Sequence, residues 1–290
     1  MKLVRFGEKG RERPGVVATD GSFRDVSSIV DDFSPETLSG ELLRKLRSIN
    51  LDAFPKVPAS TRIAAPLSRT GHFIAIGLNY ADHAEETGSP IPAEPIIFSK
   101  ASSCLSGPND TVYIPRGAEK CDWELELAII IGKGGSYIEE SDAIDHVLGY
   151  AICNDVSERA YQLERGGQWV KGKSAPTFGP VGPWIVTTDE IADPHNLSMF
   201  LELNGQKVQS GSTKTMIFSV AQIVSYCSNF MLLEPGDIIT TGTPPGVGMG
   251  QKPPRFLKDG DTMRLHIEGL GEQKQSVSAA GTGEGRVRAA

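Results

Sequence analysis

The chain has 290 residues, 39% of them hydrophobic, which is enough for one large domain or for a main domain with a smaller one. Its 36 acidic and 29 basic residues give a formal net charge of −7 at pH 7, which argues against a nucleic-acid surface or a polybasic membrane anchor and favours small-molecule chemistry. The longest apolar runs are much shorter than the roughly 20 residues of a membrane helix, and the N-terminus has no apolar signal core, so we expect a cytoplasmic protein.

The N-terminal 65 residues are typical of a small β-rich domain. Short apolar runs at Leu3–Phe6 and Gly15–Ala18 predict strands, and the apolar spacing across Pro35–Arg47 predicts a helix. Three prolines from position 55 to position 66 indicate a linker. We therefore expect a separate N-terminal domain over residues 1–65.

After the linker, short apolar strands alternate with Gly and Pro turns, which predicts a catalytic domain over residues 70–278. The expected strands are His72–Gly77, Ile96–Ser99, Glu124–Ile131, Leu148–Asp155 and Asp237–Thr241. An Asn-Gly pair within Leu201–Val208 indicates a tight hairpin, and Ser219–Phe230 has the apolar spacing of a helix. The tail, residues 281–290, is expected to be disordered.

Strands outnumber helices in this prediction, and strands and helices do not alternate regularly. The expected fold class is therefore α+β and β-dominated, with a mixed sheet rather than a doubly wound parallel one. The four cysteines have no CxxC spacing, so we expect free, mostly buried thiols and neither a zinc cluster nor a disulfide framework.

Two glutamates, two residues apart, open the run Asp122–Gly132. Side chains at i and i+2 lie on the same face of a strand, so Glu124 and Glu126 are expected to project together. Taken alone, such a pair is most often a solvated strand face. Asp155 ends a second apolar strand and adds a third carboxylate, and three carboxylates without histidine or cysteine suit Mg²⁺ or Mn²⁺ better than Zn²⁺. The pattern therefore predicts a metal site.

A histidine and a glutamate lie in a short helical pattern that follows a strand, within Gly77–Glu86. His83 and Glu86 are three residues apart, so they can touch on a helix. A carboxylate bonded to one ring nitrogen would orient the imidazole and let it deprotonate water. An exposed histidine in an acidic helix fits the spacing equally well.

Further polar candidates follow in the second half of the chain. Arg159 and Gln162, three residues apart on an expected helix, could offer a guanidinium and an amide to an anionic or keto substrate. Lys173 lies in a Gly- and Pro-flanked loop, where a solvated lysine is the favoured interpretation, although beside a metal it could stabilise an oxyanion. A Gly-rich turn could lend Thr243 and backbone N–H groups to a ligand, or it could be purely structural.

Five motifs in this order resemble those of the fumarylacetoacetate hydrolase family over residues 72–276: Gly-x-Asn-Tyr-x-x-His, Asp-x-Glu-x-Glu-Leu, Asn-Asp-x-Ser-x-Arg, Lys-Ser and Thr-Gly-Thr-Pro-x-Gly. Within the family, the stretches Lys171–Trp184 and Thr243–Gly248 look most like bacterial 2,4-diketo-3-deoxy-L-fuconate or rhamnonate hydrolases, whose relatives also carry the label ureidoglycolate lyase. The resemblance implies a mixed β-sandwich roll, a homodimer and a divalent cation, usually Mg²⁺, with Mn²⁺ or Ca²⁺ as alternatives.

The resemblance also implies roles for individual residues. Glu124, Glu126 and Asp155 fall on the metal ligands of the family. The water-activating dyad of the family falls on His83 and Glu86, and its catalytic lysine falls on Lys173. The substrate contacts of the family fall on Arg159, Gln162 and Thr243.

The reaction that the resemblance implies is hydrolytic cleavage of a carbon–carbon bond in a 2,4-diketo acid. The substrate would be an acylpyruvate or a sugar-derived acid, and the products would be pyruvate and a small acid. Two alternatives keep the metal and the enolate, an oxaloacetate-type decarboxylase and a 2-oxo acid tautomerase. A ureidoglycolate lyase is a third alternative.

Overall fold

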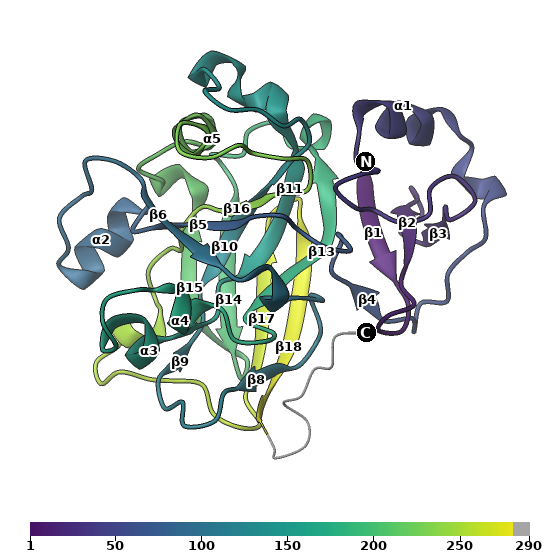
Figure 1. Ribbon diagram of the computed structural model, residues 1–290. Coiled ribbons are helices and arrows are strands. Elements are labelled where there is room, and N and C mark those ends of the chain that lie inside the picture. Colours follow the sequence, from purple (N-terminus) through teal and green to yellow (C-terminus); the bar gives the residue numbers. More distant parts are fainter. Residues whose placement is uncertain (281–290) are drawn as a thin grey trace.

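The structure is a computed structural model that describes residues 1–280; the tail predicted to be disordered, residues 281–290, lies outside the described residues. Figure 1 shows a strand-rich body with a few short helices at its periphery. The α+β, strand-dominated class expected from the sequence is confirmed. Within residues 1–280, none of the helices has the length and apolar character that a membrane span requires.

One large mixed sheet runs through the molecule. Its strands are β1 (Lys2–Phe6), β2 (Arg13–Val17), β3 (Phe23–Asp25), β4 (Ile63–Ala64), β5 (Phe73–Gly77), β6 (Ile96–Lys100), β7 (Leu105–Ser106), β10 (Leu125–Ile131), β11 (Val147–Asn154), β13 (Gly179–Thr187) and β16 (Ile238–Thr240). The order across the sheet is β3-β2-β1-β13-β11-β10-β16-β5-β6, with β4 beside β1 and β7 beside β13. Since β1 pairs with β13, the N-terminal strands extend this sheet (Figure 1). The division into two domains near residue 65 stays a prediction.

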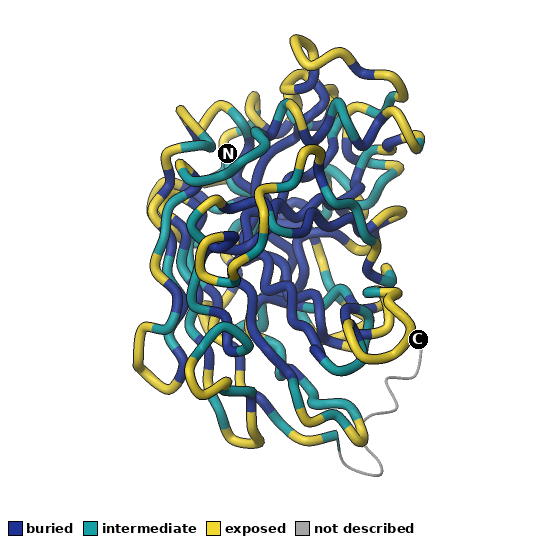
Figure 2. The backbone as a smooth tube through the Cα atoms, turned by 90° about the vertical axis from the view of Figure 1, so that its left-hand side faces the viewer, coloured by how far each residue is buried: buried dark blue, intermediate teal, exposed yellow. Residues whose placement is uncertain are grey.

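A second sheet packs against the first. It consists of β15 (Gln206–Ser212), β14 (Ser198–Leu203), β17 (Thr262–Ile267), β18 (Gly271–Ala279) and β8 (Val112–Ile114), in that order, and β9 (Cys121–Asp122) pairs separately with β12 (Ser157–Glu158). Asn204 and Gly205 join β14 to β15 with φ angles of 53° and 77°, which confirms the tight Asn-Gly hairpin. Apolar side chains from both sheets form one core, which Figure 2 shows as dark blue tube inside an exposed periphery.

The helices are short. They are α1 (Gly40–Ser48), α2 (Ala81–Thr87), α3 (Arg159–Leu163), α4 (Val170–Lys173) and α5 (Val220–Ser228), and the 3₁₀ helices are Leu51–Ala53, Ser102–Cys104, Glu140–His146, Thr188–Glu190, Thr213–Thr215 and Gly248–Gly250. The helix predicted from Pro35 begins only at Gly40, because the Ser39 hydroxyl caps it by accepting the Leu42 N–H. The helix predicted over Ser219–Phe230 is confirmed, with Ser219 as its cap.

The two central strands, β10 and β11, bring distant carboxylates to the same edge of the sheet. They are antiparallel and buried along their whole length, and Leu125 pairs with Asn154. Glu124 directly precedes β10 and Asp155 directly follows β11, so the pairing places these two residues side by side, with the Asp155 N–H donating to the Glu124 carbonyl at 2.8 Å. The four cysteines are free and buried, as predicted.

Candidate functional site

Three carboxylates meet beneath the edge formed by β10 and β11. One oxygen each of Glu124, Glu126 and Asp155 lies within 4.8 Å of the others. The three residues are at most 6% exposed. The interpretation of a solvated strand face is therefore wrong for the Glu-x-Glu pair, because β6 and the segment after β11, with α3 and α4, cover that face.

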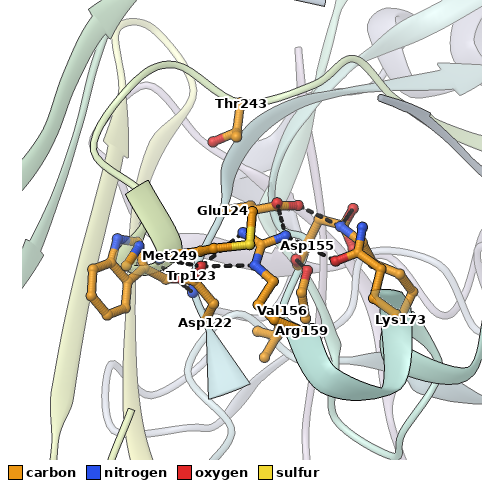
Figure 3. Close-up of polar contacts among 12 residues, drawn as sticks. Asp122, Trp123, Glu124, Asp155, Val156, Arg159, Lys173, Thr243 and Met249 are labelled. Carbon is orange, nitrogen blue, oxygen red and sulfur yellow. Dashed lines mark hydrogen bonds and ion pairs between the residues drawn. The ribbon is translucent and has the colours of Figure 1, made fainter. Parts of the chain in front are cut away.

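Buried cations contact two of these carboxylates (Figure 3). The Lys173 ammonium donates to Glu124 Oε2 at 2.5 Å and to Asp155 Oδ2 at 2.8 Å. Arg159 Nη1 lies 2.7 Å from Glu124 Oε1. Burial opposes ionisation of Glu124, but the charges of Arg159 and Lys173 outweigh it and hold the pKa of this carboxyl well below its usual range.

Glu126 differs from its two neighbours in its partners. Within residues 1–280 it forms no ion pair, and its carboxylate accepts the Gly242 N–H at 2.9 Å. Burial, together with the charges of Asp155 and Glu124, raises the pKa of Glu126 well above its usual range. A divalent cation between the three carboxylates would remove this penalty, and an all-oxygen donor set suits a hard cation. Glu124, Glu126 and Asp155 therefore fit a metal such as Mg²⁺ or Mn²⁺.

Lys173 is not a solvated loop residue, and that interpretation of the sequence is wrong. It is the last residue of α4 and is 2% exposed. The helix approaches the start of α3 so closely that a Cβ on Gly172 would stand 2.5 Å from the Glu158 carbonyl oxygen. Only glycine, which has no Cβ, permits this separation. The Lys173 ammonium also lies 4.9 Å from the centre of the Phe98 ring. The short helix thus directs its last side chain at the carboxylates.

Two further buried charged residues, Lys100 and Asp122, lie at the site and are not among the residues predicted from the sequence. The Lys100 ammonium donates to Asp155 Oδ1 and to the Lys173 carbonyl oxygen, both at 2.5 Å. Asp122 accepts from Arg159 Nε at 2.8 Å and from the backbone N–H groups of Gly248 and Met249.

The sequence contains a signal for Asp122 but none for Lys100. Asp122 opens the Asp-x-Glu-x-Glu motif and could have been included on that ground. Lys100 ends a strand in an ordinary way, and no local signal distinguishes it, because its partners lie at least 55 positions away in the sequence.

His83 and Glu86 form the pair that their spacing allowed. His83 Nδ1 lies 3.0 Å from Glu86 Oε2, and His83 is 7% exposed, so the alternative of an exposed histidine is wrong. The Glu86 carboxylate also accepts the Gly246 N–H at 3.0 Å, which connects α2 to the glycine-rich turn. Glu86 thereby has a fixed position from which it orients the imidazole.

A cavity of about 210 Å³ opens beside these groups. Of the predicted site residues, those that line it are His83, Glu124, Glu126, Arg159, Gln162, Lys173 and Thr243. Glu86 and Asp155 contact the lining residues His83 and Lys173. The structure thus gathers all nine predicted residues around one cavity, although their roles stay predictions.

Two of the predicted substrate contacts have internal partners. Gln162 Oε1 accepts from Arg159 Nη1 at 3.1 Å, so its amide nitrogen is the atom left to donate to a ligand. The Thr243 hydroxyl donates to the Leu125 carbonyl and accepts from Gln209 Nε2. Thr243 lies on the glycine-rich turn, apart from the charged cluster in Figure 3.

Residues 72–278 match the family model described as Fumarylacetoacetate (FAA) hydrolase C-terminal. The chain belongs to the fumarylacetoacetate hydrolase family. The match covers the strands and loops that carry the carboxylate cluster, His83 and Lys173, so the site described above lies within the part of the chain that defines the family.

Relatives within the fumarylacetoacetate hydrolase family span nearly the whole chain. A curated protein of Burkholderia ambifaria (strain MC40-6), which has only the provisional name of a hydrolase, is 53% identical over 97% of this chain and 100% of its own length. The fumarylacetoacetate hydrolase of psychrophilic Exiguobacterium antarcticum is 39% identical, with a TM-score of 0.85, and the comparison covers 97% of this chain and 100% of that one.

A third relative is described with its ligands. Maleylpyruvate hydrolase from Sphingobium sp. SYK-6, in complex with manganese(II) ion and pyruvate, is 32% identical, with a TM-score of 0.81, over 97% of this chain and 100% of its own. These comparisons support a strand-rich family enzyme, described most often as a hydrolase, with an acidic cluster that can hold a metal.

Proposed function

We propose that this chain is a divalent-cation-dependent hydrolase that cleaves a carbon–carbon bond of a 2,4-diketo acid, giving pyruvate and a carboxylic acid. The observation that carries the proposal is a single cavity in which a Glu86-bound His83 and Lys173 face the three-carboxylate cluster. The manganese and pyruvate described for the Sphingobium enzyme support the same kind of ligand here.

Glu124, Glu126 and Asp155 would hold the cation. When bound, the ion would supply Lewis acidity that polarises the 2-oxo group and stabilises negative charge on that oxygen. Mg²⁺ and Mn²⁺ both accept such an all-carboxylate donor set.

His83 is the proposed general base. Its Nδ1 is bonded to Glu86, which leaves Nε2 to accept a proton from water. The water oxygen then forms a bond to C4 of the substrate. The C3–C4 bond breaks, its electron pair passes to C3 as the pyruvate enolate, and the proton on His83 is returned to C3.

Lys173 and Gln162 are the proposed donors to the substrate. Two of the three ammonium hydrogens of Lys173 are used by Glu124 and Asp155, and the third can stabilise the charge that develops on a substrate oxygen. The amide nitrogen of Gln162, held by Arg159, can donate to a carboxylate or keto oxygen. Both groups are already in place before substrate binds, which lowers the cost of orientation.

The test is a substrate screen of the purified chain with added Mg²⁺ or Mn²⁺. Acylpyruvates and sugar-derived 2,4-diketo acids, the fuconate- and rhamnonate-derived acids included, would be offered, with pyruvate measured by lactate dehydrogenase. Loss of turnover in chelator, restored by the cation, is expected. Undiminished turnover with all metal removed would contradict the metal role.

Product analysis separates the rival activities of the same site. A carboxylic acid released in equal amount with pyruvate is expected for the hydrolase. Release of carbon dioxide from oxaloacetate would identify a decarboxylase. Keto-enol exchange without bond cleavage would identify a tautomerase, and release of urea and glyoxylate would identify a ureidoglycolate lyase.

A further inference from the structure

The lining of the cavity changes from charged to apolar. Its polar lining consists of the groups already described and of Thr87 and Ser89, and the Thr87 hydroxyl donates to the His83 carbonyl and to Ser89. The apolar side chains that line it are Ile76, Leu78, Phe98, Leu163, Trp169 and Met249, which we call the apolar lining. Trp169 and Phe98 pack edge to face, with ring centres 5.1 Å apart. A Cβ on Gly77 would stand 2.8 Å from the Trp169 ring, so the indole lies directly on the backbone of β5. A ligand in this cavity would therefore contact apolar side chains that are held in fixed positions.

The cations of the cavity are already matched by carboxylates. Among the described residues that line it, the permanently charged cations are Arg159 and Lys173. Arg159 lies 2.8 Å from Asp122 and 2.7 Å from Glu124, and Lys173 is shared between Glu124 and Asp155. The charge of each is therefore already compensated by carboxylates of the chain, although one ammonium hydrogen of Lys173 can still donate to the reacting end of a substrate.

The charge balance of the site points the same way. With all four carboxylates ionised, as cation binding would require, four buried carboxylates face three buried cations and leave one negative charge in excess: Asp122, Glu124, Glu126 and Asp155 against Lys100, Arg159 and Lys173. A divalent cation would turn this into one positive charge, and the single carboxylate of a 2-oxo acid would neutralise it. A second substrate carboxylate against the apolar lining would lose water without gaining an uncompensated cation among the described lining residues, which is costly.

We propose that the site selects 2,4-diketo acids whose 4-acyl group is short, uncharged and apolar, over dicarboxylic and polyhydroxylated acids, and that Trp169 is the residue that sets this specificity. The proposal rests on the proposed function, because it assumes that the 2-oxo acid end lies at the carboxylate cluster. A cavity of about 210 Å³ is smaller than the ~300–1,000 Å³ typical of drug-sized ligands, which fits a short acyl chain.

A substrate series tests the selection. Acetyl-, butanoyl- and hexanoylpyruvate would be compared with maleylpyruvate and a 2,4-diketo-3-deoxy sugar acid. We expect kcat/KM to rise about tenfold or more between acetylpyruvate and the best longer acyl chain, because a single methylene in an apolar pocket is worth roughly tenfold or more. The charged and hydroxylated acids should fall about 100-fold below that acid. Equal or faster turnover of either would overturn the proposal.

A binding measurement separates failure of this proposal from failure of the proposed function. 2-Oxohexanoate and 2-oxoadipate have equal chain length, differ by one terminal carboxylate, and lack the 4-oxo group that cleavage requires. By calorimetry with the Mn²⁺-loaded protein, we expect 2-oxohexanoate to bind about tenfold tighter or more. If 2-oxoadipate binds as tightly, the specificity proposal fails and the function survives. If neither acid binds, the proposed function fails.

Variants of the apolar lining supply the last test. Trp169→Ala should lower kcat/KM for the longer acylpyruvates about 30-fold, mainly through KM, and acetylpyruvate much less, whereas Trp169→Phe should keep the preference. Equal losses for both substrates would mean that Trp169 has only a structural role.

A second variant, Leu163→Arg, tests the charge argument. Leu163 is 47% exposed, so the substitution should be tolerated, and the added cation should raise turnover of maleylpyruvate about tenfold. No gain would count against the charge argument. Phe230→Ala, at an exposed aromatic outside the cavity, is the matched control.

Discussion

The ammonium nitrogen of Lys173 lies 2.5 Å from Oε2 of Glu124, so a proposed oxyanion donor contacts a proposed metal ligand directly. Both groups are buried, and Asp155 binds the same ammonium at 2.8 Å. A cation in this position stabilises the carboxylates when no metal is present, and it also competes with a metal for them. Removing it should therefore affect metal binding and turnover in opposite directions.

Lys173→Met is expected to lower turnover about 100-fold or more through loss of the oxyanion donor. Mn²⁺ should bind more tightly to this variant, because the competing positive charge is gone. Electron paramagnetic resonance of free Mn²⁺ and steady-state kinetics give the two readouts. Lys171→Met changes an exposed lysine of the same helix and should alter neither. Weaker Mn²⁺ binding to Lys173→Met would show that Lys173 is needed to hold the carboxylates in place.

Glu126→Gln should abolish metal binding and turnover without destabilising the metal-free protein. The substitution removes a buried carboxylate that burial and the neighbouring Asp155 and Glu124 make costly to ionise. Thermal unfolding should give a melting temperature equal to or above that of the native chain without metal, and no increase when Mn²⁺ is added. An undiminished Mn²⁺-dependent increase would remove Glu126 from the ligand set.

His83→Ala should slow hydrolysis by about 10²–10⁴-fold, the usual range for loss of a general base, and should leave Mn²⁺ affinity unchanged. Glu86→Gln should have a smaller effect, because an amide can still accept the imidazole N–H and orients the ring more weakly. Single-turnover kinetics on an acylpyruvate would measure the water step. A native rate in His83→Ala would show that another group is the base.

The buried thiols predict how the protein responds to alkaline pH. Burial raises the pKa of Cys104 to about 11 and that of Cys121 and Cys227 to about 12. The folded state then holds these protons more tightly than the unfolded state does, so this contribution to stability is present below about pH 9 and is lost as the pH rises through 11 to 12.

The alkaline prediction can be checked with Ellman's reagent. At pH 8 the native protein should react negligibly, and all four thiols should react in guanidinium chloride, because the reagent requires an accessible thiolate. Urea unfolding at pH 8 and pH 10.5 should show lower stability at the higher pH, with a smaller difference in Cys227→Ala. Rapid reaction of a native thiol at pH 8 would contradict the burial argument.

Gly246 is expected to tolerate no side chain. Its φ is +104°, and a Cβ there would stand 1.9 Å from the Val208 carbonyl oxygen, so Gly246→Ala should cost about 3 kcal/mol or more. Gly205 also has a positive φ, but nothing lies within 4 Å of its Cβ position, so Gly205→Ala should cost only about 1–2 kcal/mol. Urea unfolding would measure the loss in the free energy of unfolding for each variant. The difference between the two losses gives the cost of the steric clash separately from the cost of backbone strain.

Local sequence patterns predicted part of the secondary structure and the donor type of the candidate metal site, but the long strands β13 and β18 were not among the predicted elements. The Asn204-Gly205 turn and the Ser219 cap follow from side-chain and backbone preferences within a few residues, so the structure agrees with both predictions. The Glu-x-Glu spacing likewise predicts a shared strand face, whatever lies around it.

Family resemblance, rather than spacing, was needed for His83 and Lys173. Spacing allowed His83 to touch Glu86 but could not tell a buried imidazole from an exposed one, and it favoured a solvated Lys173. Burial depends on what packs over a segment, and that comes from β5, β6 and the turn at Gly246. These elements are distant in sequence, so no local pattern contains the answer.

The sequence by itself determined the strand-rich class, the hard-oxygen donor set and the family. Only the tertiary structure showed that Lys100 and Asp122 complete the charge balance and that Trp169 faces the same cavity as the carboxylates. The physical reason is that donor type and periodicity are properties of neighbouring residues. Desolvation and charge compensation depend instead on every group that folding brings within a few ångströms.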